Sequence, residues 1–140
     1  MVKYSQQKKI KNIIQYGNAK SKSGQMLRLK SEFDFVRENG IKYVGKYFLL
    51  VHSKAFAKRV RIGIICGRRF NKNAVTRNRA RRLIKESFRL LKSQIAASDI
   101  IFIPRRRIMS KHLQDVQSEM IELLTKAGIW IEPTQKEDSE

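Results

Sequence analysis

Acidic and basic residues are distributed unevenly along the chain, and the imbalance is greatest over residues 39–85. This stretch contains no Asp or Glu and fourteen Lys and Arg residues. Like charges gathered on one surface repel one another and destabilise a compact domain unless a polyanion neutralises them. The 140 residues carry a net charge of +19, which is more than solubility requires. We therefore expect one domain that folds a modest core beneath a basic surface and binds a polyanion.

An anionic membrane is one candidate polyanion, but it favours a basic amphipathic helix whose apolar face is free to insert. Here the apolar faces are needed for the core. The longest apolar runs, residues 47–51 and 62–66, are far shorter than a bilayer crossing, and the lysine-rich start lacks the apolar stretch of a signal peptide. We expect no membrane partner. The single cysteine, Cys66, indicates a reducing, cytoplasmic compartment.

Composition divides the chain into three parts. Residues 1–26 resemble a basic flexible arm, because their lysines are interspersed with Gly, Ser, Asn and Gln and show no apolar period. Residues 27–131 form the patterned domain, and residues 132–140 form an acidic tail. Met26 stands directly before the domain, which raises the hypothesis that translation begins there.

The first half of the domain is predicted to contain a short helix and two strands. Ser31 is placed to cap the helix and Gly40 to end it. Residues 42–52 and 59–66 are apolar enough for strands, and the second alternates clearly. Residues 53–58 are predicted to join them as a hairpin connection.

The second half is predicted to be helix, strand and helix. Residues 75–95 place an apolar stripe beside a basic face, so one helix carries both core and binding surface. Residues 99–103 are typical of a strand buried on both faces and ended by Pro104. Ser110 is predicted to cap a last helix that Gly128 closes. The whole order predicts an α+β sandwich whose sheet is covered mainly on one side.

The most basic stretch, residues 67–89, is a loop that leads into the start of the long predicted helix. Unpaired N–H groups and the positive dipole end at a helix N-terminus favour phosphates. Arginine binds phosphate oxygens in pairs through its planar fork. The Asn78 amide both donates and accepts, so it suits an arginine, a 2′-hydroxyl or a base edge.

The ordered string over residues 73–89 resembles the signature of the bacterial ribonuclease P protein component. The resemblance covers about residues 27–128 and includes Arg28-Leu29-Lys30, Phe33-Asp34-Phe35-Val36, Arg61-Ile62-Gly63-Ile64 and Asp99-Ile100-Ile101. It implies a single-domain α-β-β-β-α-β-α sandwich with a left-handed crossover, similar to the second domain of ribosomal protein S5. It also implies an RNA-binding subunit that assists a catalytic RNA, the ribonuclease P RNA, in removing the 5′ leader from precursor tRNA.

The resemblance further implies which side chains contact RNA. In the loop and helix these are Arg68, Arg69, Lys72, Asn73, Arg77, Asn78, Arg79, Arg81, Arg82, Lys85 and Arg89. A cleft for the single-stranded leader is expected to be lined by Phe33, Arg37, Phe48 and Val51. Arg37 and Val51 stand where many members have aromatic residues, so leader binding is expected to rely more on charge.

The residues predict no catalytic site in the protein itself. A two-cation nuclease needs convergent carboxylates, which the centre of the chain lacks. His52 and His112 form a conceivable acid–base pair, but strand packing and surface positions explain them more simply. Cys66 is predicted to be a core residue, and Trp130 to pack against the sheet or last helix rather than stack on a base. We expect Mg²⁺ to be bound mainly by the RNA.

A different function remains open on composition alone. A non-enzymatic ribosomal or assembly protein would use the same kind of basic helix on ribosomal RNA, and only the ordered motif separates the two. A DNA partner is not expected, because no helix-turn-helix or dimer heptad is evident. Residues 105–107, three consecutive arginines, either extend the RNA surface or form a solvated loop.

Overall fold

The computed structural model describes residues 26–54 and 57–133. The predicted basic arm, apart from Met26, and residues 134–140 of the acidic tail lie outside these residues. Within the described ranges, no helix is long and apolar enough to cross a membrane.

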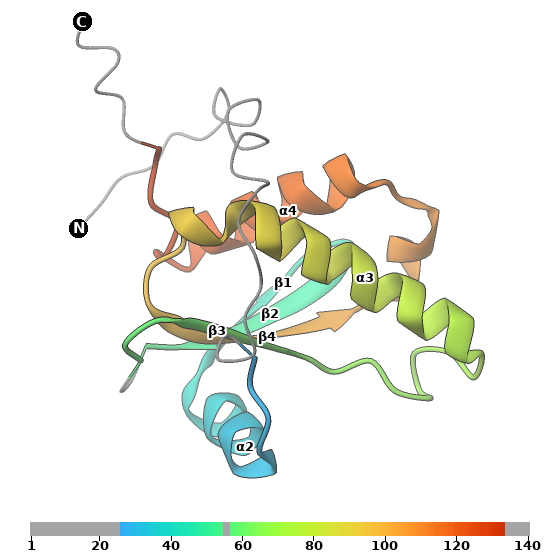
Figure 1. The fold of residues 1–140 in the computed structure, drawn as a ribbon, viewed down its shortest axis with the longest axis horizontal. Coiled ribbons are helices and arrows are strands. Elements are labelled where there is room, and N and C mark those ends of the chain that lie inside the picture. Colours follow the sequence, from blue (N-terminus) through green and yellow to red (C-terminus); the bar gives the residue numbers. More distant parts are fainter. Residues whose placement is uncertain (1–25, 55–56, 134–140) are drawn as a thin grey trace, which may run out of the picture.

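The described residues form three helices and a four-stranded sheet (Figure 1). In chain order the elements are α2 (Lys30–Asn39), β1 (Ile41–Val44), β2 (Phe48–Ser53), β3 (Val60–Ile64), α3 (Ala74–Leu91), β4 (Ser98–Pro104) and α4 (Leu113–Lys126). Two short 3₁₀ turns, η4 (Lys92–Gln94) and η5 (Arg106–Ser110), flank β4. The predicted α-β-β-β-α-β-α order is confirmed.

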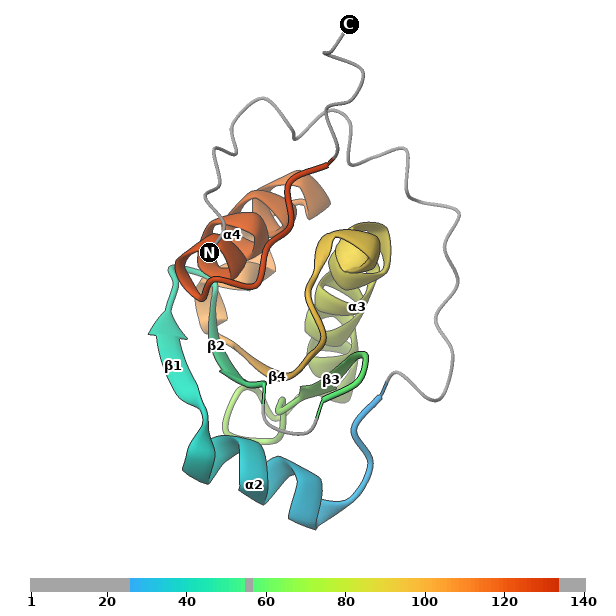
Figure 2. The ribbon, with the colours of Figure 1, turned by 90° about the vertical axis from the view of Figure 1, so that its left-hand side faces the viewer.

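The strands lie in the order β1-β2-β4-β3. β4 pairs antiparallel with β2, where Leu50 lies opposite Phe102, and parallel with β3, where Ile62 lies opposite Ile100. β4 therefore separates β2 from β3, so the hairpin predicted over residues 53–58 is wrong. Figures 1 and 2 show the β3-α3-β4 crossover passing over one face of the sheet in the left-handed sense, the rarer hand for such a unit.

The single strand predicted over residues 42–52 is also wrong, because the chain turns between Val44 and Phe48. The buried Glu119 carboxylate of α4 accepts three successive backbone N–H groups of this turn, those of Lys46 at 2.9 Å, Tyr47 at 2.7 Å and Phe48 at 3.2 Å. A partner more than seventy residues away thus fixes the turn, and apolar periodicity within the segment carries no sign of it.

The sheet has a helix layer on each face (Figure 2). α3 and α4 cover one face, and the larger core lies between them and side chains such as Phe48, Leu50 and Phe102. α2 crosses the other face over a smaller cluster of Leu27, Val36, Val51 and Ile101. Because side chains alternate along a strand, neighbouring residues of β2 and β4 enter different cores.

The start of α2 differs from the prediction. Ser31 is not the cap, because it lies exposed inside the first turn, and Leu29 is the residue before the helix. The Glu32 carboxylate instead accepts the backbone N–H groups of Leu29 at 3.0 Å and of Arg28 at 2.8 Å. Gly40 ends the helix as predicted. A Cβ there would lie 2.6 Å from the backbone oxygen of His52, so the close approach of α2 to β2 requires glycine.

The last helix also begins later than predicted. Ser110 belongs to η5, where its Oγ donates to the Arg107 carbonyl at 3.2 Å. His112 is the N-cap of α4, and its N–H donates to Asp115 Oδ2 at 2.9 Å. Gly128 follows the helix with φ at 77°, the left-handed conformation that terminates many helices.

Candidate nucleic-acid interface

Asn73 sets the start of α3. Its side-chain oxygen accepts the backbone N–H groups of Val75 at 2.8 Å and Thr76 at 3.3 Å, which satisfies two donors that a helix start leaves unpaired. Asn73 was predicted to contact RNA; its side-chain oxygen caps the helix, and the residue is exposed. The helix ends at Leu91, earlier than the predicted residue 95, and continues as the turn η4.

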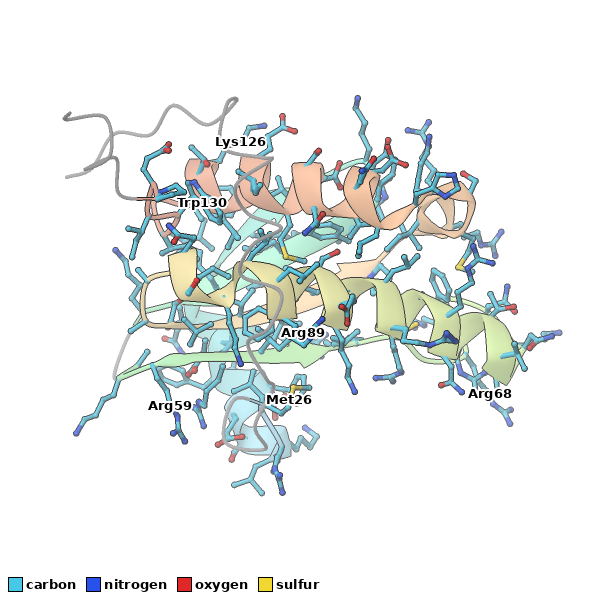
Figure 3. The ribbon with its side chains drawn as sticks, turned by 45° about the horizontal axis from the view of Figure 1, so that its top comes forward. Met26, Arg59, Arg68, Arg89, Lys126 and Trp130 are labelled. Carbon is cyan, nitrogen blue, oxygen red and sulfur yellow. The ribbon has the colours of Figure 1, made fainter. Side chains whose placement is uncertain are left out.

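The inner face of α3 confirms the predicted apolar stripe. Ala80, Ile84, Phe88 and Leu91 are all buried against the sheet. The side of α3 that faces away from this core carries the charge. Eight of the predicted RNA contacts on the loop and helix are exposed, namely Arg68, Arg69, Lys72, Asn73, Asn78, Arg79, Arg82 and Lys85. Figure 3 shows Arg68 at the start of this basic surface, beyond the first turn of α3.

Two arginines of the motif hold the loop that precedes the helix. Arg77 Nη1 donates to the backbone oxygens of Asn71 at 3.0 Å and Lys72 at 2.9 Å. Arg81 Nη2 donates to the Cys66 oxygen at 3.1 Å. Both side chains are half-buried. We call Arg77 and Arg81 the loop braces, because their guanidinium groups fix the basic loop against α3.

Arg89 is paired along the helix with Glu86, the one acid between residues 39 and 98. The hydrogen bonds from Arg89 lower the pKa of the Glu86 carboxyl, and those same bonds raise the pKa of the Arg89 guanidinium. Glu86 is therefore a carboxylate at neutral pH. Its charge cancels that of Arg89 locally, so the exposed positive surface lies mainly N-terminal to this pair.

A hollow of about 380 Å³ lies on the α2 side, next to the basic loop. Arg37 of α2 forms one wall, and the apolar side chains of Ile65 and Ile103 lie beside it. The remaining lining residues are Gly67, Arg69, Phe70, Pro104, Arg105 and Arg106. The hollow therefore combines an apolar floor with several guanidinium groups, which suits an extended polyanion that has flat apolar bases.

Of the four residues predicted to line the leader cleft, only Arg37 lines this hollow. Phe48 was predicted wrongly, because it is fully buried on the α3 side of the sheet, edge-on to Phe102 with ring centroids 5.4 Å apart. Val51 is 6% exposed and packs beneath α2. Phe33 is half-buried and lies on Gly63, where a Cβ would come within 2.4 Å of its ring.

Sequence reasoning missed Ile65, Phe70 and Ile103 as lining residues of the hollow. A signal for Ile65 was available, because alternation along residues 59–66 puts it on the same face as Arg61 and Gly63. No comparable signal existed for Ile103. Its segment is apolar on both faces, so only the pairing of β4 between β2 and β3 shows which face it occupies.

Arg61 is one of the fourteen cations within residues 39–85, but it is bound within the fold and not left free on the basic surface. Its guanidinium binds Asp99 through two bonds of 3.0 Å each and Glu32 through one of 2.9 Å. Hydrogen bonding to Asp99 and then to Glu32 raises its pKa further. Arg61 thus joins β3, β4 and α2. We call Arg61, Asp99 and Glu32 the Arg61 clamp.

The other candidate chemical groups have structural positions. His52 is 5% exposed within the sheet, which confirms the strand-packing interpretation. Cys66 is buried, and burial raises the pKa of its thiol, as expected of a core cysteine. Trp130 is fully buried in the larger core, so it is not placed to stack on a base. In the part of the chain that the structure describes, no group of three or more His, Cys, Asp or Glu residues could hold a metal ion.

The left-handed crossover, the basic surface of α3 and the neighbouring hollow define a small α+β domain of the nucleic-acid-binding class. Comparison with known proteins makes the assignment specific. The sequence model of the family described as Ribonuclease P matches residues 22–128. The chain therefore belongs to the family of ribonuclease P protein components, and its activity is that of a subunit of the ribonuclease P holoenzyme.

Individual relatives agree with this assignment. The ribonuclease P protein component of Clostridium botulinum (strain Loch Maree / Type A3) is 37% identical over 106 residues, which cover 74% of this chain and 95% of the relative. The solved RNase P protein of Staphylococcus aureus is 26% identical, with a TM-score of 0.66 over 76% of this chain and 97% of that one. The protein from Thermotoga maritima is 28% identical, with a TM-score of 0.65 over 72% and 96%. The alternative of a ribosomal or assembly protein is not favoured.

Proposed function

We propose that this chain docks on the ribonuclease P RNA through the exposed basic surface of α3 and holds the 5′ leader of precursor tRNA in the hollow beside α2. The observation that carries the proposal is the placement of the two sites. The loop that contains Arg69 belongs to the basic surface and also lines the hollow. One protein can therefore contact two RNA molecules at once and reduce the repulsion between them.

The hollow suits a single-stranded leader better than a duplex. Its apolar floor of Ile65 and Ile103 accepts bases, while Arg37 and Arg69 on its walls attract phosphates. Neither aromatic residue of α2, Phe33 or Phe35, lines the hollow, and Phe33 is packed on Gly63. We expect little base preference in the leader, since charge and apolar contact tolerate any base.

The donor atoms around both sites do not suit a protein-held cation. Guanidinium groups dominate the walls of the hollow, and the nearby carboxylate of Glu86 is paired with Arg89. In this proposal the Mg²⁺ ions that activate the attacking water are held mainly by the RNA. The protein supplies positioning and charge, and it acts in the cytoplasm, where precursor tRNA is made.

Reconstitution with a ribonuclease P RNA at low Mg²⁺ tests the proposal. Cleavage is measured for two precursor tRNAs that differ only in leader length, one long and one with a single leader nucleotide. Arg37→Gln combined with Arg106→Gln, which also lines the hollow but lies outside the basic loop, is expected to raise KM for the long-leader substrate only. Arg59→Gln combined with Lys58→Gln removes the same charge from the two exposed residues that precede β3 and is the matched control. If wild-type protein gives no stimulation, or if both variants impair both substrates equally, the proposal is wrong.

A further inference from the structure

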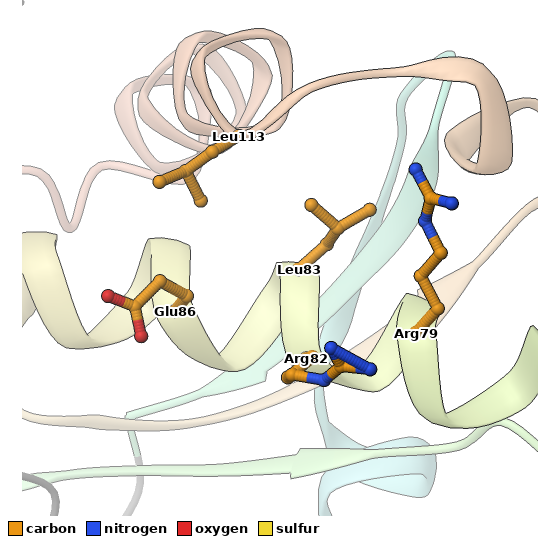
Figure 4. Close-up of a pocket in the computed structure, with 5 residues that line it drawn as sticks. All are labelled: Arg79, Arg82, Leu83, Glu86 and Leu113. Atoms are coloured by element: carbon orange, nitrogen blue, oxygen red, sulfur yellow. The ribbon is translucent and has the colours of Figure 1, made fainter. Parts of the chain in front are cut away.

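A second pocket, of about 360 Å³, lies where α3 faces the start of α4. Figure 4 shows the Leu83 side chain pointing from α3 toward Leu113 of α4, with Arg79 and Glu86 on either side of Leu83 along α3. Arg82 completes the lining. The family's RNA-binding motif and the apolar packing of the two helices meet at this place. The proposed function above uses Arg79 and Arg82 for their charge but assigns no role to Leu83, Glu86 or Leu113.

The lining combines one apolar floor with cations at the rim. Residues 79, 83 and 86 recur at helical spacing, so they lie on one stripe of α3. Leu83 and Leu113 are each half-buried, which leaves part of each side chain facing the pocket. Arg79 and Arg82 are exposed. A flat ring that is apolar on its faces and polar at its edge fits such a lining, and a guanidinium group can stack on it.

Glu86 gives the pocket a feature that phosphate binding does not explain. It is the one acid between residues 39 and 98, and it lies among cations that would otherwise all attract phosphate. Arg89 holds the carboxylate in place by pairing with it, and the lowered pKa keeps it ionised. A carboxylate accepts hydrogen bonds and never donates them, so it selects base edges that carry amino or imino N–H groups.

We propose that this pocket receives one unpaired nucleobase of the ribonuclease P RNA, with Leu83 and Leu113 against its face, Arg79 beside it and Glu86 accepting a hydrogen bond from its edge. The inference rests on the proposed function, because it assumes that the RNA subunit lies on α3. The leader is not the source of the base. The pocket lies in the α3–α4 layer, whereas the hollow assigned to the leader lies on the α2 side of the sheet.

Glu86→Gln tests the inference, because two explanations predict opposite signs. If the surface attracts RNA by charge alone, the removal of a negative charge leaves affinity unchanged or raises it. If Glu86 accepts a hydrogen bond from a base, the neutral oxygen of Gln is a weaker acceptor than the carboxylate, and affinity for the RNA subunit falls roughly 3- to 10-fold, the difference between a hydrogen bond to a charged group and one to a neutral group. Glu122→Gln makes the same charge change at an exposed position of α4 outside the pocket and is expected to bind as wild type or more tightly.

A photo-cross-linking experiment shows which RNA molecule supplies the base. A photoactivatable group is attached to Leu113→Cys in the full chain, where the native Cys66 is only 2% exposed. The holoenzyme is assembled with ribonuclease P RNA and precursor tRNA and then irradiated. Cross-links to unpaired nucleotides of the RNA subunit support the inference. Cross-links to precursor tRNA alone, or to neither RNA, overturn it.

Thermal unfolding of the variant and RNA binding by wild-type protein distinguish failure of the pocket inference from failure of the proposed function. Thermal unfolding of Glu86→Gln is expected to match that of wild type closely, since the pair with Arg89 is partly exposed. If wild-type protein binds the RNA and stimulates cleavage while Glu86→Gln binds as Glu122→Gln does, the pocket inference is wrong and the proposed function stands. If wild-type protein does not bind the RNA, the proposed function has failed as well.

Discussion

The loop braces and the exposed arginines of α3 are expected to respond differently when their charge is removed. One double variant changes the braces, Arg77→Gln and Arg81→Gln. The other changes two exposed positions, Arg79→Gln and Arg82→Gln. Both variants lose the same charge from the same helix, so each is the matched control for the other. The structure predicts that the first loses stability and the second loses phosphate contacts.

The stability difference follows from the hydrogen bonds. The two braces make three bonds to loop carbonyls, at 2.9, 3.0 and 3.1 Å. Each bond contributes about 0.5–1.5 kcal/mol, and partial exposure of the loop favours the low end, so their loss costs about 2 kcal/mol. For a domain of this size that corresponds to a fall in Tm of about 8–16 °C. The exposed pair is expected to change the free energy of unfolding by less than about 0.5 kcal/mol.

The binding difference shows in the salt dependence. If wild-type protein neutralises about six phosphates, log K falls with log salt at a slope of roughly −4 to −5. Loss of two phosphate contacts makes the slope shallower by roughly 1.4–1.8. This change is expected for the exposed pair. The brace variant is expected to keep most of its slope below its Tm while binding more weakly, because the loop cations remain but are no longer held in place.

Fluorescence anisotropy of labelled ribonuclease P RNA over a salt series gives the slopes, and calorimetry gives the two Tm values. The reasoning is refuted if the brace variant has the same Tm as wild-type protein and its salt slope is as shallow as that of the Arg79→Gln/Arg82→Gln variant. That result would mean that Arg77 and Arg81 leave the loop carbonyls and bind phosphates directly. A salt slope near zero for wild-type protein would refute the electrostatic account as a whole.

Three further predictions concern the fold. Phe48→Ala is expected to lower the free energy of unfolding by about 3–5 kcal/mol, because it empties a fully buried site, and urea unfolding measures this; a near-neutral result would place Phe48 outside the core. Arg61→Met is expected to cost about 2–3 kcal/mol, since Asp99 is left buried without its partner, and restoration of stability by Asp99→Asn in the same chain checks the cause. Burial, followed by the charge of Lys54, lowers the pKa of His52 below its ordinary 6.5. The unfolded chain therefore binds more protons between the two pKa values, and stability falls as pH drops below about 6.5. Urea titrations at several pH values should show a flatter profile for His52→Phe.

The sequence predicted the elements of the α3–α4 layer well because local signals decide them. The apolar stripe of α3, the basic face beside it and the glycine after α4 all depend on neighbours within a few residues. The strands were harder, because pairing is decided by distant partners. Nothing within residues 42–58 shows that β4 will enter between β2 and β3, or that Glu119 will fix the turn before β2.

The candidate site was likewise predictable only where local sequence decides the structure. Residue type and order were sufficient to locate the basic helix, but they do not distinguish an arginine that binds phosphate from one that binds a carbonyl. Arg77 and Arg79 are separated by one residue in the motif, yet one holds the loop and the other is exposed. The hollow was misplaced for a different reason. Phe48 and Val51 are three residues apart on one strand, so period two puts them on opposite faces of the sheet.

The distribution of acids explains why so basic a chain can fold. Four acids outside α3 each bind a structural partner. Glu32 and Asp99 hold Arg61, the Asp115 carboxylate accepts the N–H of the N-cap residue of α4, and Glu119 fixes the β1–β2 turn. These acids stabilise the fold at points away from the exposed side of α3, where Glu86 offsets Arg89 alone. The positive charge left over on α3 is therefore concentrated on one surface, and the repulsion within it is relieved when a polyanion binds. It follows that RNA binding and the stability of α3 are coupled, and that added RNA should raise the Tm of wild-type protein more than that of the Arg79→Gln/Arg82→Gln variant.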